Sequence, residues 1–261
     1  MNEIIVTTAG DPTPELQDEA RKISAELEGL YLERGRQSLA SMVAGGAEQL
    51  LVVGKNGMVV HTPGGQMFFH LSMAQLRLKN VTDGKSDHMA EAMGLGAGDS
   101  VLDCTLGLAT DAIVASYLTG AAGRVQGIEA STLLFFLVRE GLKNFDTASE
   151  SLNAALRRIG VVNADSGEYL RRQPAKSWDI VFFDPMFRQP VYRSSALKPL
   201  RFLADKRPLT EAMIAEACRV ARRRVVIKEA SGSEEFARLG CRRLAGGKYS
   251  SVAYGIIDCD D

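Results

Sequence analysis

The fold of this chain is decided by the stretch Val101-Leu102-Asp103-Cys104-Thr105-Leu106-Gly107-Leu108-Ala109-Thr110-Asp111. The apolar run from Ser100 to Asp103 predicts a short strand, and residues 111–118 predict a helix. Gly107, between them, allows the backbone to approach a ligand closely, and the start of the helix presents free N–H groups. A strand, loop and helix of this kind are typical of the ligand-binding edge of an α/β sheet.

Strands and helices alternate downstream of this unit. Further strands are predicted at Arg124–Glu129, Val161–Asp165, Trp178–Asp184 and Val225–Lys228, with helices over residues 133–144, 149–159 and 209–220 between them. The alternation predicts a mostly parallel sheet covered by helices on both faces. At the end of the chain, Arg242–Leu244 and Ser251–Ile257 flank Gly246-Gly247 and predict an antiparallel hairpin. A seven-stranded sheet with such a hairpin favours the methyltransferase variant of the Rossmann-like, doubly wound fold.

The residues before this unit follow another pattern. Ile4–Thr8 predicts a strand, Pro14–Leu27 a helix, and Leu50–Val53 with Met58–His61 a hairpin around Gly54 and Gly57. Another strand is predicted at Met67–Phe69, and two helical stretches then lead to a turn at Gly98-Asp99. We therefore predict a small N-terminal α/β domain over residues 1–95 and a larger domain over residues 96–261.

The composition is that of an ordinary globular protein, with 261 residues, 46% hydrophobic and 24% charged. No run reaches the roughly 18 to 20 apolar residues that a membrane span requires, and the first residues lack the pattern of a signal peptide. The four cysteines, Cys104, Cys218, Cys241 and Cys259, have no disulfide or metal-ligand spacing. We expect a cytoplasmic protein with reduced thiols, no membrane contact and no metal.

Acidic residues stand at the ends of three predicted strands. Asp103 ends the first, Glu129 ends the second, and Asp165 lies at the end of the third. Because the carboxyl ends of parallel strands meet at one edge of a sheet, these side chains are expected to line one site. Glu129, 22 residues after Gly107, can accept both hydroxyl groups of a ribose. Asp165 can accept a hydrogen bond from an adenine amino group.

The glycine pattern argues against a dinucleotide or a nucleoside triphosphate, because neither GxGxxG nor GxxxxGK is present. Asp103 and Asp111 predict an acidic mouth, which favours the sulfonium and ammonium groups of S-adenosylmethionine and repels phosphates. Each carboxylate alone could be a helix cap, but polar residues at four strand ends favour a methyl-donor site. From the residues alone, this site comprises Asp103, Thr105, Gly107, Asp111, Glu129 and Asp165.

The fourth strand ends in Asp184-Pro185-Met186-Phe187. This sequence has the form of the (D/N)PP(Y/F) signature of methyltransferases that act on amino groups conjugated to a ring. The lone pair of such a nitrogen is delocalised, and acceptors at its N–H groups favour a localised lone pair. We expect the Asp184 carboxylate and the Pro185 carbonyl to supply these acceptors, and Phe187 to stack on the base. The alternative is an ordinary Asp-Pro turn at the end of a strand.

Basic residues follow this motif. Residues 188–207 contain Arg188, Arg193, Lys198, Arg201, Lys206 and Arg207 against one acidic residue, Asp205. A basic loop beside the target pocket is what an RNA substrate would require, and the run Arg222-Arg223-Arg224 could add to it. The net charge is only −1, yet residues 1–150 carry 11 Lys and Arg against 19 Asp and Glu, and residues 151–261 carry 20 against 13.

Several of these segments resemble a known family. The stretch from Val101 to Ala112 resembles the DATAGLGRDA segment of the J-type small-subunit ribosomal RNA guanine-N2 methyltransferases, and Asp184-Pro185-Met186-Phe187 followed by Ser195-Ala196-Leu197-Lys198 resembles their DPMFPH…KSALVKK. Met73-Ala74 with Arg77 is similar to their MAHRR segment, and Val225–Lys228 to their VVVK strand. The resemblance covers about residues 66–230. It implies a class I S-adenosylmethionine-dependent fold with cofactor contacts at Thr110, Asp111, Glu129, Ala130, Asp165, Ser166 and Asp184.

The chain departs from the family pattern in two places. Ala109-Thr110 stands where the family has Gly-Arg, and Arg188-Gln189 stands where it has Pro-His. A divergent branch of the family would show such differences. The leading expectation is methylation of an exocyclic base amine in RNA, most directly guanine N2 in small-subunit ribosomal RNA. The alternatives are a methyltransferase acting on a protein side chain or a small molecule, and a non-catalytic module that binds RNA or the cofactor.

Overall fold

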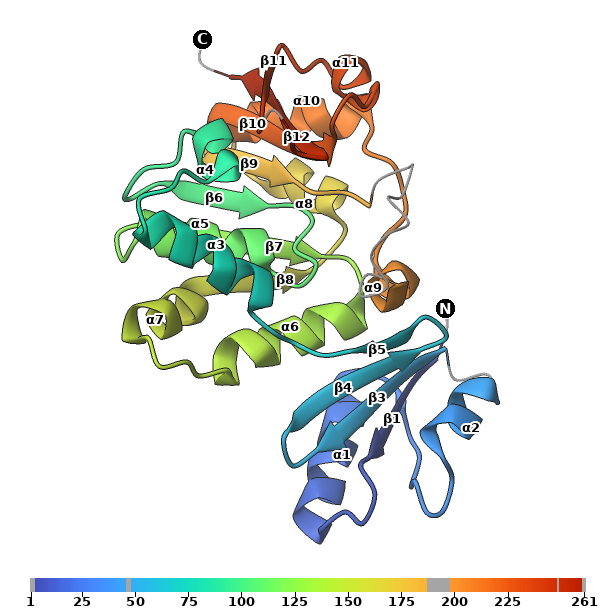
Figure 1. Cartoon of the computed structure of the whole chain (residues 1–261). Coiled ribbons are helices and arrows are strands. Elements are labelled where there is room, and N and C mark those ends of the chain that lie inside the picture. Colours follow the sequence, from blue (N-terminus) through green and yellow to red (C-terminus); the bar gives the residue numbers. More distant parts are fainter. Residues whose placement is uncertain (1–2, 46–47, 187–197, 248, 260–261) are drawn as a thin grey trace.

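The computed structural model describes residues 3–45, 48–186, 198–247 and 249–259. These residues form two β-sheets, one of five strands and one of seven. Figure 1 shows the smaller sheet, in blue, beside the larger sheet and its helices. Phe187 and most of the predicted basic loop fall in residues 187–197 and so lie outside the described residues.

The smaller sheet has the strand order β2-β1-β3-β4-β5. Its elements are β1 (Ile4–Thr8), α1 (Pro14–Glu26), β2 (Leu30–Tyr31), α2 (Leu39–Ala44), β3 (Gln49–Gly54), β4 (Gly57–Thr62) and β5 (Gly65–Met67). The predicted hairpin is β3–β4, with Val53 opposite Met58. β5 begins two residues earlier than predicted because the turn is tight. There the Gly64 N–H donates to the Thr62 hydroxyl over 3.1 Å, and that hydroxyl donates to the Gly65 carbonyl.

Two helices connect the sheets, α3 (Ser72–Thr82) and α4 (His88–Met93). α3 packs on α5, while α4 packs on β10 and β12 of the larger sheet. Gly94, in the left-handed conformation at φ 56°, ends α4. The domain boundary near residue 95 stays a prediction.

The larger sheet has the order β11-β12-β10-β9-β6-β7-β8. Its strands are β6 (Ser100–Asp103), β7 (Arg124–Glu129), β8 (Ile159–Asn163), β9 (Trp178–Phe183), β10 (Ala221–Ala230), β11 (Arg243–Ala245) and β12 (Val252–Asp258). All neighbouring pairs are parallel except those of β12, which runs antiparallel to β10 and β11. The predicted sheet with its C-terminal antiparallel hairpin is confirmed. Strand order reverses between β6 and β9, where such sheets bind ligands.

Helices cover both faces of this sheet because its strands are apolar on both sides. They are α5 (Thr110–Thr119), α6 (Thr132–Asn144), α7 (Glu150–Arg158), α8 (Ser166–Arg172), α10 (Glu211–Val220) and α11 (Glu235–Arg238). A further helix, α9 (Lys198–Leu203), packs on the smaller sheet instead. Along β9, Ile180 and Phe182 pack in the core under α5 and α6, whereas Val181 and Phe183 pack in the core under α8 and α10.

The two sheets are joined by direct packing. Phe69, after β5, meets the ring of Phe145 edge-on with centroids 5.7 Å apart. Arg139 on α6 pairs with Glu26 on α1 at 2.6 Å, and α9 packs on β4 and β5. The larger lobe therefore contacts the smaller one through both α6 and α9 (Figure 1).

Two sequence features can be placed on this fold. The four cysteines are free thiols, with Cys104 and Cys259 buried and Cys218 and Cys241 half-buried. No helix within the described residues has both the length and the apolar character needed to cross a bilayer.

Candidate functional site

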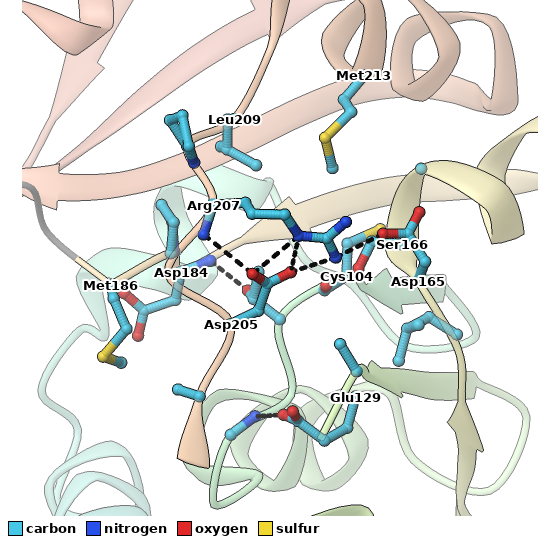
Figure 2. Close-up of a pocket in the computed structure, with 18 of the residues that line it drawn as sticks. Cys104, Glu129, Asp165, Ser166, Asp184, Met186, Asp205, Arg207, Leu209 and Met213 are labelled. Carbon is cyan, nitrogen blue, oxygen red and sulfur yellow. Dashed lines mark hydrogen bonds and ion pairs between the residues drawn. The ribbon is translucent and has the colours of Figure 1, made fainter. Parts of the chain in front are cut away.

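Two adjoining cavities open at the carboxyl edge of the larger sheet, where β6, β7, β8 and β9 end. The first cavity has a volume of about 400 Å³ and the second about 910 Å³. Both are lined by Thr105 and Gly107 after β6 and by Asp184, Pro185 and Met186 after β9. Figure 2 shows the first cavity, with Glu129 on one side and Asp165 and Ser166 on another.

The predicted site residues come together around these cavities. The first is lined by Thr105, Gly107, Glu129, Ala130, Asp165, Ser166, Asp184 and Pro185, and the second adds Thr110 and Asp111. Asp103 does not line either cavity: it is buried beneath them, and its Oδ1 accepts the Thr105 N–H over 3.0 Å.

The loop after β6 is shaped by two residues in the left-handed conformation, Gly107 at φ 53° and Ala109 at φ 62°. This conformation is unusual for a residue with a Cβ, and here it turns the chain directly into α5. Thr105 ties the loop to β9, because its hydroxyl oxygen accepts the N–H of Asp184. The ends of β6 and β9 are thus held together at the point where the cavities meet.

Glu129 is buried at the end of β7, and backbone N–H groups donate to both of its oxygens. Its Oε2 accepts the Gly107 N–H over 3.1 Å, and its Oε1 accepts the Ser131 N–H over 2.9 Å. Burial raises the pKa of this carboxyl to about 7, against the lowering effect of these backbone donors. A carboxylate offers about four acceptor positions. Acceptor capacity therefore remains on this carboxylate for a donor such as a hydroxyl group.

Asp165 accepts hydrogen bonds from two groups of the protein, and its contact with an adenine stays a prediction. Its Oδ1 caps α8 by accepting the Glu168 N–H over 2.8 Å, and its Oδ2 accepts from Arg207 over 2.7 Å. Arg207 also pairs with Asp205, and Figure 2 shows this cluster across the cavity from Glu129. The Ser166 hydroxyl donates to the Cys104 carbonyl. Each oxygen of Asp165 therefore already accepts one hydrogen bond from the protein, and a ligand donor would use the remaining acceptor capacity.

A chain of alternating charges lines the second cavity. Arg77 on α3 binds Asp87 through two hydrogen bonds of 2.8 Å and also pairs with Asp111 at the start of α5. Lys228 on β10 donates to Asp111 Oδ2 over 3.0 Å and to Asp184 Oδ2 over 2.7 Å. This series of ion pairs joins α3, α5, β9 and β10, which are distant in the sequence.

The prediction of an acidic mouth formed by Asp103 and Asp111 is wrong, because neither carboxyl group contributes an unpaired negative charge. Lys228 and Arg77 outweigh burial and hold the pKa of Asp111 at about 2, so this group is charged but paired. Burial raises the pKa of Asp103 to about 8, so it is largely neutral at pH 7. For Asp184, burial and the neighbouring Asp111 raise the pKa to about 6, against the opposing effect of Lys228.

The run Arg222-Arg223-Arg224 lies at the opposite edge of the sheet. Arg222 pairs with Asp179 at the start of β9, and Arg223 pairs with Asp99 just before β6. These contacts are at the amino ends of the strands, so the run does not add to the charge around the cavities.

Sequence reasoning assigned no site role to Lys228, Tyr254 or Leu200, which line the second cavity. Lys228 had one signal, a cation at the carboxyl end of a buried β-branched strand. Leu200 lies on the short helix α9, which no pattern indicated, and Tyr254 stands opposite Lys228 only because β12 pairs with β10.

Comparison with known proteins identifies the family. The family model described as "Putative SAM-dependent methyltransferase" matches residues 51–248. A Bacillus subtilis relative, "Uncharacterized protein YpiP", is 41% identical over 254 residues, which is 97% of this chain and 98% of that protein. The chain belongs to the SAM-dependent methyltransferase family, whose cofactor is S-adenosylmethionine.

Two further similarities are more distant. The "Ribosomal RNA small subunit methyltransferase J" of Acinetobacter baumannii is 32% identical over 150 residues, 57% of this chain and 52% of that protein. The match thus spans about half the length of that relative. The crystal structure of the SAM-dependent methyltransferase NGO1261 from Neisseria gonorrhoeae has a TM-score of 0.66 at 16% identity and covers 97% of this chain and 95% of its own. This likeness confirms the fold.

Proposed function

We propose that this methyltransferase acts on an exocyclic base amine of RNA, and most specifically on guanine N2 of small-subunit ribosomal RNA. The observation that carries the proposal is the meeting of the two cavities at Asp184, Pro185 and Met186. A methyl donor in the first cavity and a planar acceptor in the second would face each other beside the Asp184 carboxylate.

The first cavity fits the cofactor by the chemistry of its donors and acceptors. The Glu129 carboxylate accepts backbone N–H groups on both oxygens and has further acceptor capacity, which suits the hydroxyl groups of a ribose. Asp165, Ser166 and Ala130 would border the adenine, and Thr105 and Gly107 the methionine part. Thr110 and Asp111, which line the second cavity, would lie where the methionine part reaches the junction of the two cavities. Asp103 would support the loop from below.

When bound, the cofactor supplies an electrophilic methyl group, and the S–C electron pair returns to sulfur as the acceptor nitrogen forms the N–C bond. Asp184 and the Pro185 carbonyl would accept the two N–H groups of the amine and so favour a localised lone pair. The methylated nitrogen then loses one proton, which the Asp184 carboxylate can take up and pass to water. Stacking by Phe187 remains a prediction for a residue outside those described.

An RNA acceptor is supported by charge and by relatedness. Arg201 and Lys206 line the second cavity, where they could contact phosphates. A distant relative is named as a ribosomal RNA methyltransferase, and this chain matches about half of its length. Because a base within a duplex is out of reach, the target nucleotide should lie in a loop or be flipped out.

The experiment is transfer of labelled methyl groups from S-adenosylmethionine to RNA from cells that lack this protein, offered as naked RNA and as small ribosomal subunits. We expect label in one of these RNA samples and none in RNA from wild-type cells. Digestion of the labelled RNA would then locate the methylated base. Asp184→Asn should lower transfer by about 100-fold or more and leave cofactor binding within a few-fold.

Asp146→Asn is the matched control, since Asp146 is an exposed carboxylate that pairs with Arg157 on the surface. It should transfer methyl groups at the wild-type rate. Absence of label from both RNA forms, with cofactor binding intact by calorimetry, would reject RNA as the acceptor and favour a protein or small molecule. An Asp184→Asn enzyme of full activity would reject the catalytic assignment.

A further inference from the structure

One cation forms ion pairs with two carboxylates where the cavities meet. Lys228 Nζ lies 3.0 Å from Asp111 Oδ2 and 2.7 Å from Asp184 Oδ2, and the lysine side chain is only 20% exposed. Asp111 is closely packed, with its side chain 7% exposed. Two carboxylates that share one site cannot both stay ionised without a cation between them.

The two carboxylates are not equally dependent on Lys228. Asp111 has a second cation in Arg77, which reaches it from α3 and is itself fixed by Asp87. Lys228 is the only cation that forms an ion pair with Asp184 among the residues that the structure describes. Loss of the ammonium group would therefore leave Asp111 charged and force the proton onto Asp184.

We propose that Lys228 is a positioning residue for methyl transfer, which keeps the Asp184 carboxylate ionised and held at the junction of the two cavities. The catalytic part of this proposal rests on the proposed function, because an ionised Asp184 is what accepts the N–H groups of the amine. Lys228 itself is not assigned a contact with either reactant.

Other charged and titratable groups lie around Asp184 on the neighbouring elements. Asp111 on α5 faces it from one side, and Asp103 lies beneath it at the end of β6. Tyr254 on β12 stands opposite Lys228, and burial raises the pKa of its hydroxyl to about 12, so it stays neutral. Arg77 faces Asp111, and Arg201 and Lys206 line the wall of the second cavity. Of the cations in the part of the chain that the structure describes, Lys228 is the one in hydrogen-bond contact with Asp184.

The test is a titration of the Asp184 carboxyl by ¹³C NMR without cofactor, with the resonance assigned from its loss in Asp184→Asn. We expect a midpoint near pH 6 in the wild-type protein and an upward shift of roughly one to three pH units in Lys228→Met. Lys228→Arg should keep the wild-type midpoint. Lys79→Met, at an exposed lysine on α3, is the matched control and should change nothing.

The pH profile of kcat gives the second readout. Its acid limb should move upward in Lys228→Met, and for a shift of one pH unit or more transfer falls at least about threefold at pH 6.5 and partly recovers at pH 9. A lysine with only a structural role would lower kcat equally at every pH. An unmoved acid limb, or an unchanged Asp184 midpoint, would overturn the proposal.

Asp111→Asn keeps the proposal testable if Lys228→Met does not fold. With the competing carboxylate gone, Lys228 serves Asp184 alone, so the Asp184 midpoint should fall below its wild-type value. An unchanged or raised midpoint would overturn the proposal. Because the titration needs no acceptor, a shifted midpoint without transfer to any RNA would reject the proposed function and leave the role of Lys228 in place.

Discussion

Glu129 and Asp184 are carboxylates that the protein stabilises in two different ways in a partly desolvated site. Backbone N–H groups support Glu129 on both oxygens, whereas a lysine side chain supports Asp184 on one. Backbone donors are fixed by the fold and leave the outer acceptor positions open, which suits recognition of a ligand. A side-chain cation sets the charge of its partner, which suits chemistry.

Cofactor affinity should depend on the charge of Glu129. Its pKa is raised to about 7, so the carboxylate that accepts two hydroxyl groups is present above pH 7 and is lost as the pH falls below it. Affinity for S-adenosylmethionine should therefore increase from pH 6 to pH 8, which calorimetry at constant ionic strength can measure.

Glu129→Gln supplies the comparison for this prediction, because its amide does not titrate. We expect it to bind about tenfold more weakly at pH 8, as the loss of a charge-assisted hydrogen bond of about 1.5 kcal/mol implies. Its affinity should also change less with pH than that of the wild-type protein. Identical pH dependence in both proteins would show that another group controls binding.

The sequence predicted the gathering of carboxylates better than it predicted their charges. Asp103, Glu129, Asp165 and Asp184 each end or follow a parallel strand, and topology alone brings such positions to one edge. Their partners are different in kind. Lys228 is 117 residues from Asp111, and Arg77 comes from a helix outside the parallel sheet, so no local pattern could indicate either ion pair.

At the scale of elements, α9 links the smaller sheet to the site. It lies over the turn between β4 and β5, where a Cβ on Gly64 would stand 2.6 Å from the Phe202 ring and 2.8 Å from the Lys198 carbonyl. On α9, Leu200 is buried and lines both cavities. The close approach at Gly64 therefore sets how far a wall of the site can move toward the smaller sheet.

Gly64→Ala should push α9 away from this turn. We expect a loss of about 1–3 kcal/mol in the free energy of unfolding, as for other overpacked contacts, and severalfold weaker cofactor binding. Chemical denaturation and calorimetry would measure the two effects. Gly10→Ala is the control, because a Cβ there would meet no atom within 4 Å. Equal behaviour of the two variants would contradict this role of Gly64.

The long elements were predictable, whereas several short helices were not. The strands of the larger sheet were placed within a few residues because β-branched and apolar runs have few alternatives in a buried parallel sheet. The helices α2, α8, α9 and α11 have four to seven residues. One or two turns are too short to show a helical period, and tertiary packing decides their conformation.

At the scale of the whole molecule, the uneven charge is partly neutralised where the halves meet. Lys228 of β10 pairs with Asp111 of α5, and Arg223 of β10 pairs with Asp99 ahead of β6. Arg201 and Lys206 keep positive charge at the second cavity. The location of these positive charges at the second cavity, more than the net charge of the chain, therefore supports an RNA partner.

Neutralising this pair should change the salt dependence of RNA binding. We expect Arg201→Gln with Lys206→Gln to reduce the slope of log K against log salt by about 0.7 for each lost phosphate contact with single-stranded RNA. Lys22→Gln with Lys143→Gln, on the exposed surfaces of α1 and α6, should leave the slope unchanged. Filter binding at several salt concentrations would measure both, and equal slopes for the two double variants would contradict a local contact.

The shared wall between the two cavities has a consequence for inhibition. Seven described residues line both spaces: Thr105, Gly107, Asp184, Pro185, Met186, Leu200 and Pro208. A bisubstrate compound that joins an adenosine to a planar ring through a short linker could occupy both at once. The second group would then bind at an effective concentration in the millimolar range, so two weak fragments could give one tight and selective ligand.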